Sequence, residues 1–419
     1  MPYCFFQTFG CQMNVADSDE LQRMLSERGY LSTSNPNDAD LIIVNTCSVR
    51  DHAEQRAKTR IAEFARQKRK GARLWVIGCM AERLGDTLKQ EITGIDTVIG
   101  AKAIDKMDQY LARYLPGSTD EHTGIVKKSE VSDFVAVMRG CNNYCAYCIV
   151  PYVRGPEMSI SADQITESVR KKVDQGICEI TLLGQNVNSY NDNGIDFADL
   201  LVKVAAIDGI KRIRFTTSHP KDCSEKLIKT IADNQKLCHH FHLPFQAGSD
   251  RILSLMNRRY SASQYLDLID KIRQFVPDAD ITTDILVGFP SETEEDFEQT
   301  LSIVKKVRFT TAFMFAYSIR EGTKAAEMTD NIDELVKISR LNRLIDLQTA
   351  ITRQIYEQTV GKQIEILISG RQEKRDKMWM GIDNGCKRTL LSCENVKAGM
   401  ILNVRAVKSS GMTLICERV

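Results

Sequence analysis

Short apolar runs alternate with longer amphipathic stretches through the first hundred residues. Runs at 3–8, 41–45 and 74–77 have the length of buried strands, and apolar positions recur with helical spacing at about 18–28 and 51–69. Alternation of this kind predicts a parallel sheet covered by helices.

A cysteine closely follows each of these three strands, in the pairs Gly10-Cys11, Thr46-Cys47 and Gly78-Cys79. The carboxyl ends of parallel strands meet at one edge of a sheet, where ligands of open α/β sheets bind. We therefore expect the three thiols to converge on one point. Core packing would explain any one of these cysteines, but it explains the shared position of all three less well.

A second alternation begins after a polar stretch at 116–133, which has the composition of a linker. Apolar runs predict six further strands, at 135–139, 179–183, 212–216, 240–243, 281–287 and 312–317. Helical stretches fit between them, so the pattern predicts a partial (βα)6 barrel with its chemistry at the carboxyl ends of the strands.

The end of the chain changes character. A long helix at about 332–358 precedes short apolar runs broken by Gly and Asn, which predict a small all-β barrel. We therefore expect an α/β protein with three domains and one linker. Their boundaries are 1–115 for the N-terminal α/β domain, 116–133 for the linker, 134–358 for the partial barrel and 359–419 for the β-barrel.

The composition is that of a globular protein rich in thiols. Of 419 residues, 43% are hydrophobic and 26% charged, and the longest apolar stretch, 74–81, is far shorter than the roughly 18 to 20 residues of a membrane span. The N-terminus lacks the basic region and apolar core of a signal peptide, so we expect a cytoplasmic protein. Because disulfides rarely persist in that compartment, some of the 13 cysteines are expected to hold metal.

Two basic windows lie far apart in a chain whose net charge is only +1. From 50 to 73 there are nine Lys or Arg against three acids, and from 361 to 419 there are eleven against six. Either window is explained by a solvated helix face or an edge strand, and both together are compatible with an RNA-binding surface.

Three further thiols lie within eight residues, in Cys141-Asn142-Asn143-Tyr144-Cys145-Ala146-Tyr147-Cys148. A loop of this spacing after the first strand of a βα barrel can wrap one metal centre. A zinc site normally has four ligands, and no fourth Cys or His lies close in sequence. A 4Fe-4S cluster held by three thiolates leaves one iron open to a small molecule, and it is the better interpretation.

The spacing of Cys141, Cys145 and Cys148, with Tyr147 before the last, resembles the signature of radical S-adenosylmethionine enzymes. Cys11, Cys47 and Cys79 resemble the N-terminal cluster site of the methylthiotransferases in that superfamily. The resemblance covers essentially the whole chain in order, from Thr8-Phe9-Gly10-Cys11-Gln12-Met13-Asn14 to a terminal module similar to the TRAM RNA-binding barrel. Within that module, Gly381-Ile382-Asp383-Asn384-Gly385 departs from the usual pattern.

The resemblance implies two 4Fe-4S clusters, one on each cysteine set, together with S-adenosylmethionine. It implies two uses of that cofactor: methylation of a sulfur held by the N-terminal cluster, and formation of a 5'-deoxyadenosyl radical at the other. The stretches at 182–188 and 242–249 resemble the branch that modifies C2 of N6-dimethylallyladenosine at position 37 of tRNA. The implied partners are the anticodon stem-loop of tRNA and an electron donor such as flavodoxin or ferredoxin, and the chain is expected to be a monomer.

Two alternatives stay open on the sequence. One is a sibling methylthiotransferase that acts on threonylcarbamoyl-adenosine in tRNA or on an aspartate of a ribosomal protein. The other is a non-catalytic metal-cluster protein that binds RNA. Three-cysteine sites with an open iron make poor purely structural sites, which disfavours the second.

Positions at strand ends give candidate contacts of S-adenosylmethionine, although each is also a plausible turn or cap residue. These candidates are Gly184, Gln185, Ser218, Gln246, Ser249 and Gly288, and Tyr147 of the cysteine loop is a further candidate. Arg154, six residues past Cys148, is a candidate catalytic residue, with a surface ion pair as the simpler alternative. The candidate RNA contacts are Lys374, Arg375, Lys377, Lys387 and Arg388. Finally, His239, His240 and His242 alternate along one strand, with His240 expected to point away from the other two.

Overall fold

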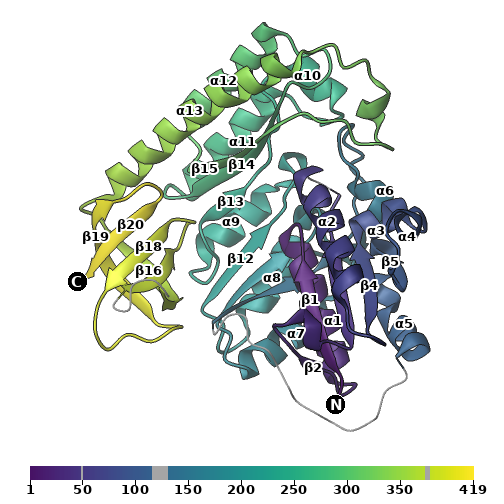
Figure 1. Ribbon diagram of the computed structural model, residues 1–419. Coiled ribbons are helices and arrows are strands. Elements are labelled where there is room, and N and C mark those ends of the chain that lie inside the picture. The colour runs from purple at the N-terminus through teal and green to yellow at the C-terminus, as the bar shows by residue number, and fades with distance from the viewer. Residues whose placement is uncertain (49–50, 116–130, 373–377) are drawn as a thin grey trace. The chain divides into compact units, whose positions relative to one another are not determined.

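The computed structural model describes residues 1–48, 51–115, 131–372 and 378–419, which pack into two compact units (Figure 1). The N-terminal unit comprises Met1–Lys128, Arg139–Asn142 and Cys148–Met158. The C-terminal unit comprises Ser129–Met138, Asn143–Tyr147 and Ser159–Val419. The short segment around Cys141–Cys148 thus contributes residues to both units.

The N-terminal unit is built on a five-stranded parallel sheet, as the sequence predicts in outline. Its strand order is β2 (Leu31–Ser32), β1 (Tyr3–Thr8), β3 (Leu41–Thr46), β4 (Arg73–Gly78) and β5 (Thr97–Gly100). The sequence patterns indicated β1, β3 and β4 but not the short edge strands β2 and β5.

Helices cover both faces of this sheet. They are α1 (Gln12–Ser26), α2 (Asp51–Gln67), α3 (Cys79–Leu84), α4 (Thr87–Glu91) and α5 (Met107–Tyr114), and the unit also holds α6 (Val150–Arg154). Alternate residues of a strand point to opposite faces. Ile42 and Val44 of β3 accordingly pack with residues of α2, whereas Leu41 and Ile43 pack with residues of α1 and α5. Burial on both faces explains why β3 is apolar along most of its length.

The C-terminal unit contains the six predicted parallel strands, arranged as two three-stranded sheets. One sheet has the order β6 (Ser132–Ala136), β9 (Glu179–Leu183) and β12 (Arg212–Thr216), and the other has β13 (His240–His242), β14 (Asp280–Val287) and β15 (Thr311–Ala316). An isolated parallel bridge from Ile213 to Leu237 links β12 to the segment that leads into β13. The predicted strand 135–139 is interrupted, because β6 ends at Ala136 and Met138–Arg139 form the separate strand β7.

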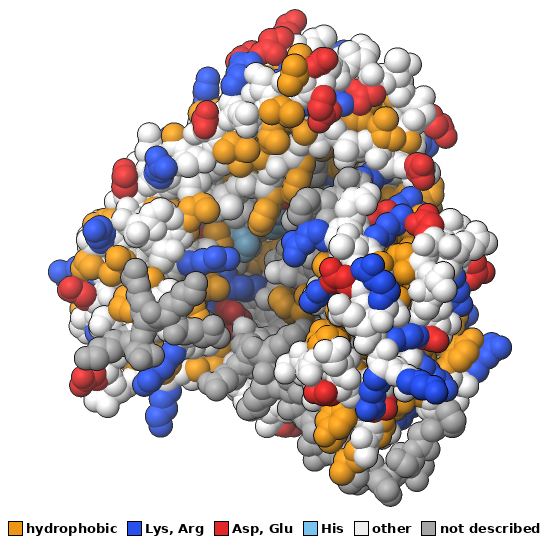
Figure 2. All heavy atoms as spheres, in the orientation of Figure 1, with side chains coloured by type: hydrophobic (Ala, Val, Ile, Leu, Met, Phe, Trp, Pro, Cys, Tyr) orange, Lys and Arg blue, Asp and Glu red, His pale blue; other side chains and the backbone are white. Residues whose placement is uncertain are grey.

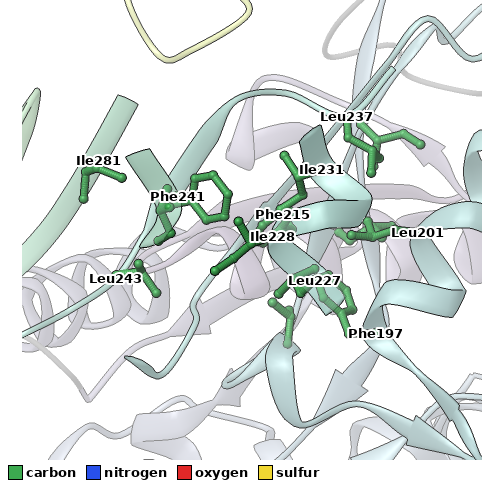
Figure 3. Packing of buried hydrophobic residues seen from close by; sticks show 14 of the residues in the cluster. Phe197, Leu201, Phe215, Leu227, Ile228, Ile231, Leu237, Phe241, Leu243 and Ile281 are labelled. Carbon is green, nitrogen blue, oxygen red and sulfur yellow. The ribbon is translucent and has the colours of Figure 1, made fainter. Parts of the chain in front are cut away.

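The helices between these strands cover one face of the two sheets. They are α7 (Ala162–Asp174), α8 (Phe197–Ala205), α9 (Glu225–Asp233), α10 (Asp250–Leu255), α11 (Ala262–Phe275) and α12 (Glu294–Val307). Figure 3 shows the packing: Phe197 and Leu201 of α8 and Leu227, Ile228 and Ile231 of α9 lie against Phe215, Phe241 and Ile281 of the strands. We call the opposite face of the six strands the inner face.

The helix α13 (Glu334–Thr359) leads to a closed five-stranded barrel, which confirms the predicted small β-barrel. The strand order is β16 (Gln363–Arg371), β17 (Met378–Asp383), β18 (Arg388–Ser392), β20 (Thr413–Arg418) and β19 (Ile401–Ser409). Among the described helices, none combines the length and apolar character needed to span a bilayer.

Charged side chains fasten this terminal barrel to the amino ends of β12 and β14. The guanidinium of Arg212 donates to Ile382 O at 2.7 Å and to Glu365 Oε1 at 3.0 Å. Arg214 donates to Asp383 O at 2.6 Å and also to Gly385 O. The Lys387 ammonium lies 2.6 and 2.7 Å from the two carboxylate oxygens of Asp280. The β17–β18 turn is therefore an integral part of the C-terminal unit.

Candidate functional site

The fold brings Cys11, Cys47 and Cys79 to one edge of the N-terminal sheet. Their strands β1, β3 and β4 are parallel neighbours, so the residues that follow them emerge at the same edge. A side chain added at Gly10 would lie 2.5 Å from Cys47 Cβ, which shows how closely the first two loops approach. Burial raises the pKa of the Cys79 thiol to about 11, and its electrostatic interactions with Cys47 and Cys11 act in the same direction.

Arg154 lies beside these thiols and is deeply buried. Its Nη2 donates to Asn14 Oδ1 at 2.8 Å and to Asp17 Oδ2 at 3.1 Å, and the guanidinium also hydrogen-bonds Cys79. Burial alone would lower its pKa, but the charges of Cys79 and Asp17 raise it above the usual value. The alternative of a surface ion pair is therefore wrong for Arg154.

A network of buried polar residues fixes the position of Arg154. Arg139 binds the other carboxylate oxygen of Asp17 at 2.6 Å. Burial would raise the pKa of Asp17, but the two guanidinium groups lower it below its usual value, so the carboxylate stays ionised. Asn14 also donates to Phe9 O and Thr46 O, which ties the first two cysteine loops together. The sequence patterns did not single out Asp17. Asn14 ends the motif 8–14 around Cys11, but no role was predicted for it.

The loop that carries Cys141, Cys145 and Cys148 makes contacts within both units. In the C-terminal unit, the buried Arg258 places Nη1 3.3 Å from Cys145 Sγ and donates to Pro244 O at 2.6 Å. The backbone of Ala146 pairs with Met256 and Ala325. In the N-terminal unit, the Cys141 amide donates to Gly155 O at 3.1 Å. Arg258 is a second residue that the sequence patterns did not single out.

The six candidate cysteines are a donor set of the kind that iron-sulfur clusters use, since thiolates hold their iron atoms. Among the described residues, no three His, Cys, Asp or Glu side chains form a group that could hold a single metal ion. All thirteen cysteines are free thiols, so none of the six candidates is committed to a disulfide.

Buried polar atoms without partners gather after β9 and β12. Within the described part of the chain they are Gln185 Oε1, both side-chain polar atoms of Asn188, Ser218 Oγ and His219 Nε2. Buried polar groups are nearly always hydrogen-bonded, so several orphans at adjacent strand ends indicate a site for a polar ligand. Gln185 and Ser218 are among the predicted cofactor contacts, whereas Asn188 and His219 are not.

His219 is a neutral hydrogen-bond donor in this group. Burial, with the nearby charges of Arg258, Lys221 and Arg259, lowers its pKa to about 2. Its Nδ1 accepts from the Lys221 amide at 3.3 Å, so in the neutral ring the proton lies on the unpartnered Nε2. The His219 ring is therefore hydrogen-bonded at only one of its two nitrogens.

The other predicted cofactor contacts have structural roles in the fold, and their contact with a cofactor stays a prediction. A side chain at Gly184 would lie 2.5 Å from Met138 Cγ, and Gly288 has a φ of +72°. Ser249 Oγ donates to Asp296 at 2.5 Å. Gln246 is buried with a φ of 68°, and Tyr147 packs beside Arg258.

The predicted RNA contacts divide into three groups. Lys374, Arg375 and Lys377 lie outside the described residues. Arg388 is exposed on β18, as a phosphate contact requires. The prediction for Lys387 needs correction. Its ammonium is buried against Asp280 and Asp383, whose charges raise its pKa although burial lowers it. Lys387 is therefore not available to phosphate.

The histidine prediction also needs correction. His240 Nε2 and His242 Nδ1 both lie within hydrogen-bond distance of Thr282 Oγ1, at 2.8 and 3.0 Å. Residues two apart on a strand share a face, so His240 points with His242 and not away from it.

Comparisons with known proteins match both units. Residues 3–100 match the family described as "Uncharacterized protein family UPF0004", and residues 135–304 match the Radical SAM superfamily. The tRNA-2-methylthio-N(6)-dimethylallyladenosine synthase of Acetivibrio thermocellus is 44% identical over 96% of this chain and 88% of its own length. The synthase of the same name from Thermoanaerobacter pseudethanolicus is 42% identical over 100% of this chain and 93% of its own.

Solved structures share the fold at low identity. The radical S-adenosylmethionine methyltransferase TsrM from Kitasatospora setae aligns with a TM-score of 0.59 and 13% identity, over 78% of this chain and 77% of that one. The cobalamin-dependent S-adenosylmethionine radical enzyme OxsB aligns with a TM-score of 0.51 and 9% identity, over 83% of this chain and 56% of that one.

Proposed function

This chain belongs to the family of tRNA-2-methylthio-N(6)-dimethylallyladenosine synthases, and from that premise we propose that it adds a methylthio group to C2 of N6-dimethylallyladenosine at position 37 of tRNA. The observation that carries the proposal is the pair of separate thiol sets, each with a buried arginine beside one of its cysteines. Arg154 accompanies Cys79, and Arg258 accompanies Cys145. One set suits radical generation and the other suits holding the sulfur to be transferred.

Cys141, Cys145 and Cys148 would hold one 4Fe-4S cluster, and Cys11, Cys47 and Cys79 the other. When bound, these clusters and S-adenosylmethionine supply the radical chemistry and the methylated sulfur that an unactivated aromatic C–H position requires, since no side chain is basic enough to deprotonate it.

The protein's own residues bind, orient and shield these groups. Arg154 and Arg258 place positive charge beside thiolates, which stabilises the anionic form that binds iron. The orphaned polar atoms of Gln185, Ser218 and His219 are available to the polar groups of S-adenosylmethionine. Their burial excludes water, which protects a reactive species from quenching.

The remaining expectations belong to the same proposal. We infer a monomer that takes electrons from a flavodoxin or ferredoxin and binds the anticodon stem-loop of its tRNA. A tRNA substrate and thirteen free thiols are compatible with the cytoplasm. The domain boundaries 1–115, 134–358 and 359–419 stay proposals, as does the linker 116–133. Residues 116–130 of that linker lie outside the described residues, and Ser132 and Asp133 belong to β6.

The experiment compares two triple variants after anaerobic reconstitution. Replacing Cys141, Cys145 and Cys148 by Ala should abolish reductive cleavage of S-adenosylmethionine and leave the other cluster bound. Replacing Cys11, Cys47 and Cys79 by Ala should leave 5'-deoxyadenosine formation intact and abolish the methylthio product. Loss of cleavage in a folded second variant would contradict the division of labour.

The substrate is tested by nucleoside analysis of tRNA from cells that lack the gene. The prenylated adenosine should accumulate without its methylthio group, and the gene should restore the modification. Loss of a methylthio group from threonylcarbamoyl-adenosine instead would move the chain to the sibling branch.

A further inference from the structure

The inner face of the C-terminal unit combines aromatic and acidic side chains at the end of β13 and midway along β14 and β15. Asp284 of β14 is paired in register with Phe313 of β15. The His242 ring stands edge-on to the Phe313 ring at 6.1 Å between centroids, and its Nε2 lies 3.6 Å from Asp284 Oδ1. These three side chains therefore form one contiguous surface, which we call the 242–284–313 surface.

Phe313 is unusual because it is a large apolar side chain left open on this face. Its neighbours Ala312 and Met314 point to the helix side and join the main core. Phe313 is 49% exposed, and every other Phe and Trp in the described part of the chain is less exposed. In Figure 2, histidine side chains are visible at the surface with hydrophobic ones beside them. An open aromatic ring on this strand face is suited to an apolar ligand group.

The charges around this surface disfavour an anionic ligand. Arg212 and Arg214 of β12 both bind the terminal barrel, and Arg214 also binds Glu179. Lys387 forms an ion pair with Asp280. The carboxylate of Asp284, 30% exposed, lies beside Phe313. A carboxylate brought to this point would meet Asp284 and none of these three cations, so repulsion works against it.

We propose that the 242–284–313 surface receives the N6 substituent of the substrate adenosine, with Phe313 selecting the dimethylallyl group and Asp284 rejecting substituents that carry a carboxylate. The inference rests on the proposed function. On adenine, N1 separates C2 from the carbon that bears N6, so a substituent on N6 occupies a different place from the reacting atom. The proposed cofactor group follows the carboxyl ends of β9 and β12, whereas Asp284 and Phe313 lie within β14 and β15.

The test measures selectivity of the reconstituted enzyme with three anticodon stem-loops, which carry adenosine, N6-dimethylallyladenosine or threonylcarbamoyl-adenosine at position 37. Binding and kcat/KM are measured for each. Phe313→Ala should reduce the preference for the prenylated over the unmodified stem-loop about tenfold, with the loss mainly in binding. Phe313→Leu, which stays apolar, should retain most of it. Asp284→Asn should improve binding of the threonylcarbamoyl form and leave the prenylated form little changed.

A matched control is Leu335→Ala, which removes an exposed apolar side chain on α13 and should not alter selectivity. Formation of 5'-deoxyadenosine and the melting temperature report folding, and Phe313→Gln replaces Phe313→Ala if the smaller side chain destabilises the unit. Unchanged prenyl preference in folded Phe313 variants would overturn this inference while leaving the function standing. A wild-type enzyme that shows no prenyl preference would overturn the proposed function itself.

Discussion

Arg154 shows how a single buried charge can organise a site. Its guanidinium joins the carboxylate of Asp17 and the amide of Asn14, both on α1, to the thiol of Cys79 at the start of α3. Ion pairs at this depth repay their desolvation only when every donor and acceptor is satisfied, as it is for Asp17 between two arginines. We therefore expect Arg154 to position the N-terminal thiols, and its predicted catalytic role stays a prediction.

Replacing Arg154 with Met should destabilise the N-terminal unit by about 3 kcal/mol, because the Asp17 carboxylate would stay buried with one cation fewer. The N-terminal cluster should be lost or spectroscopically altered, whereas the cluster on Cys141, Cys145 and Cys148 should remain. Iron content and electron paramagnetic resonance of the reconstituted protein measure both effects. Arg154→Lys keeps the charge and should recover part of the stability. A Met variant with wild-type stability and spectra would show that Arg154 does not position this site.

His219 should make the protein sensitive to acid. Burial holds its pKa near 2, below the 6.5 of an exposed imidazole, so below pH 6.5 the unfolded chain binds a proton that the folded chain does not. Stability is therefore fully present above that pH and falls as the pH drops, by at most about 1.4 kcal/mol per unit. His219→Asn keeps an acceptor for the Lys221 amide and removes the titration. Denaturant midpoints between pH 7 and 5 should fall less steeply in the Asn variant. Equal slopes would show that His219 does not cause the sensitivity.

At the scale of elements, the sequence predicted buried strands well and edge structure poorly. Glu179–Leu183 and Arg212–Thr216 have their predicted bounds. The first is mostly apolar, and the second alternates polar residues with Ile213 and Phe215, which is the period-two pattern of a strand. The two-residue strand β2 carries no such signal. The helix α1 begins at Gln12 and not near residue 18, since the chain turns into it directly after Cys11.

The candidate site was predictable where position along a strand fixes it. Cys11, Cys47 and Cys79 follow adjacent parallel strands, so their convergence could be expected from order alone. Arg258, beside Cys145, could not be assigned, because it lies 113 residues from that cysteine and only tertiary packing joins them. Lys387 was misread for a related reason: its partner Asp280 lies 107 residues away, and a basic run gives no sign that one member turns inward.

At the scale of the whole molecule, the terminal barrel completes the C-terminal unit. Arg212, Arg214 and Asp280 line the amino ends of inner strands and find their partners on that barrel. Without it Arg212 and Asp280 would lose these partners at a partly buried surface, and Arg214 would keep only Glu179 of those described above. Deletion of 361–419 should therefore lower the melting temperature of the C-terminal unit and is a poor test of RNA binding. A deletion variant as stable as the full chain would show that the fastening contributes little.

Two adjacent residues separate the architectural role of the terminal barrel from its role in RNA binding. Arg388 is exposed on β18, whereas Lys387 is enclosed by Asp280 and Asp383. Each phosphate contact contributes roughly 0.7 to 0.9 to the slope of log K against log salt. Arg388→Gln should therefore reduce that slope for tRNA binding by about this amount without changing the melting temperature. Lys387→Met should leave that slope unchanged and lower the melting temperature. It leaves a buried carboxylate uncompensated, which should reduce the free energy of unfolding by about 3 to 5 kcal/mol. Binding titrations from low to moderate salt, with thermal unfolding of both variants, measure the two quantities. An unchanged slope in Arg388→Gln would remove this residue from the RNA contacts, and a reduced slope in a folded Lys387→Met protein would return Lys387 to them.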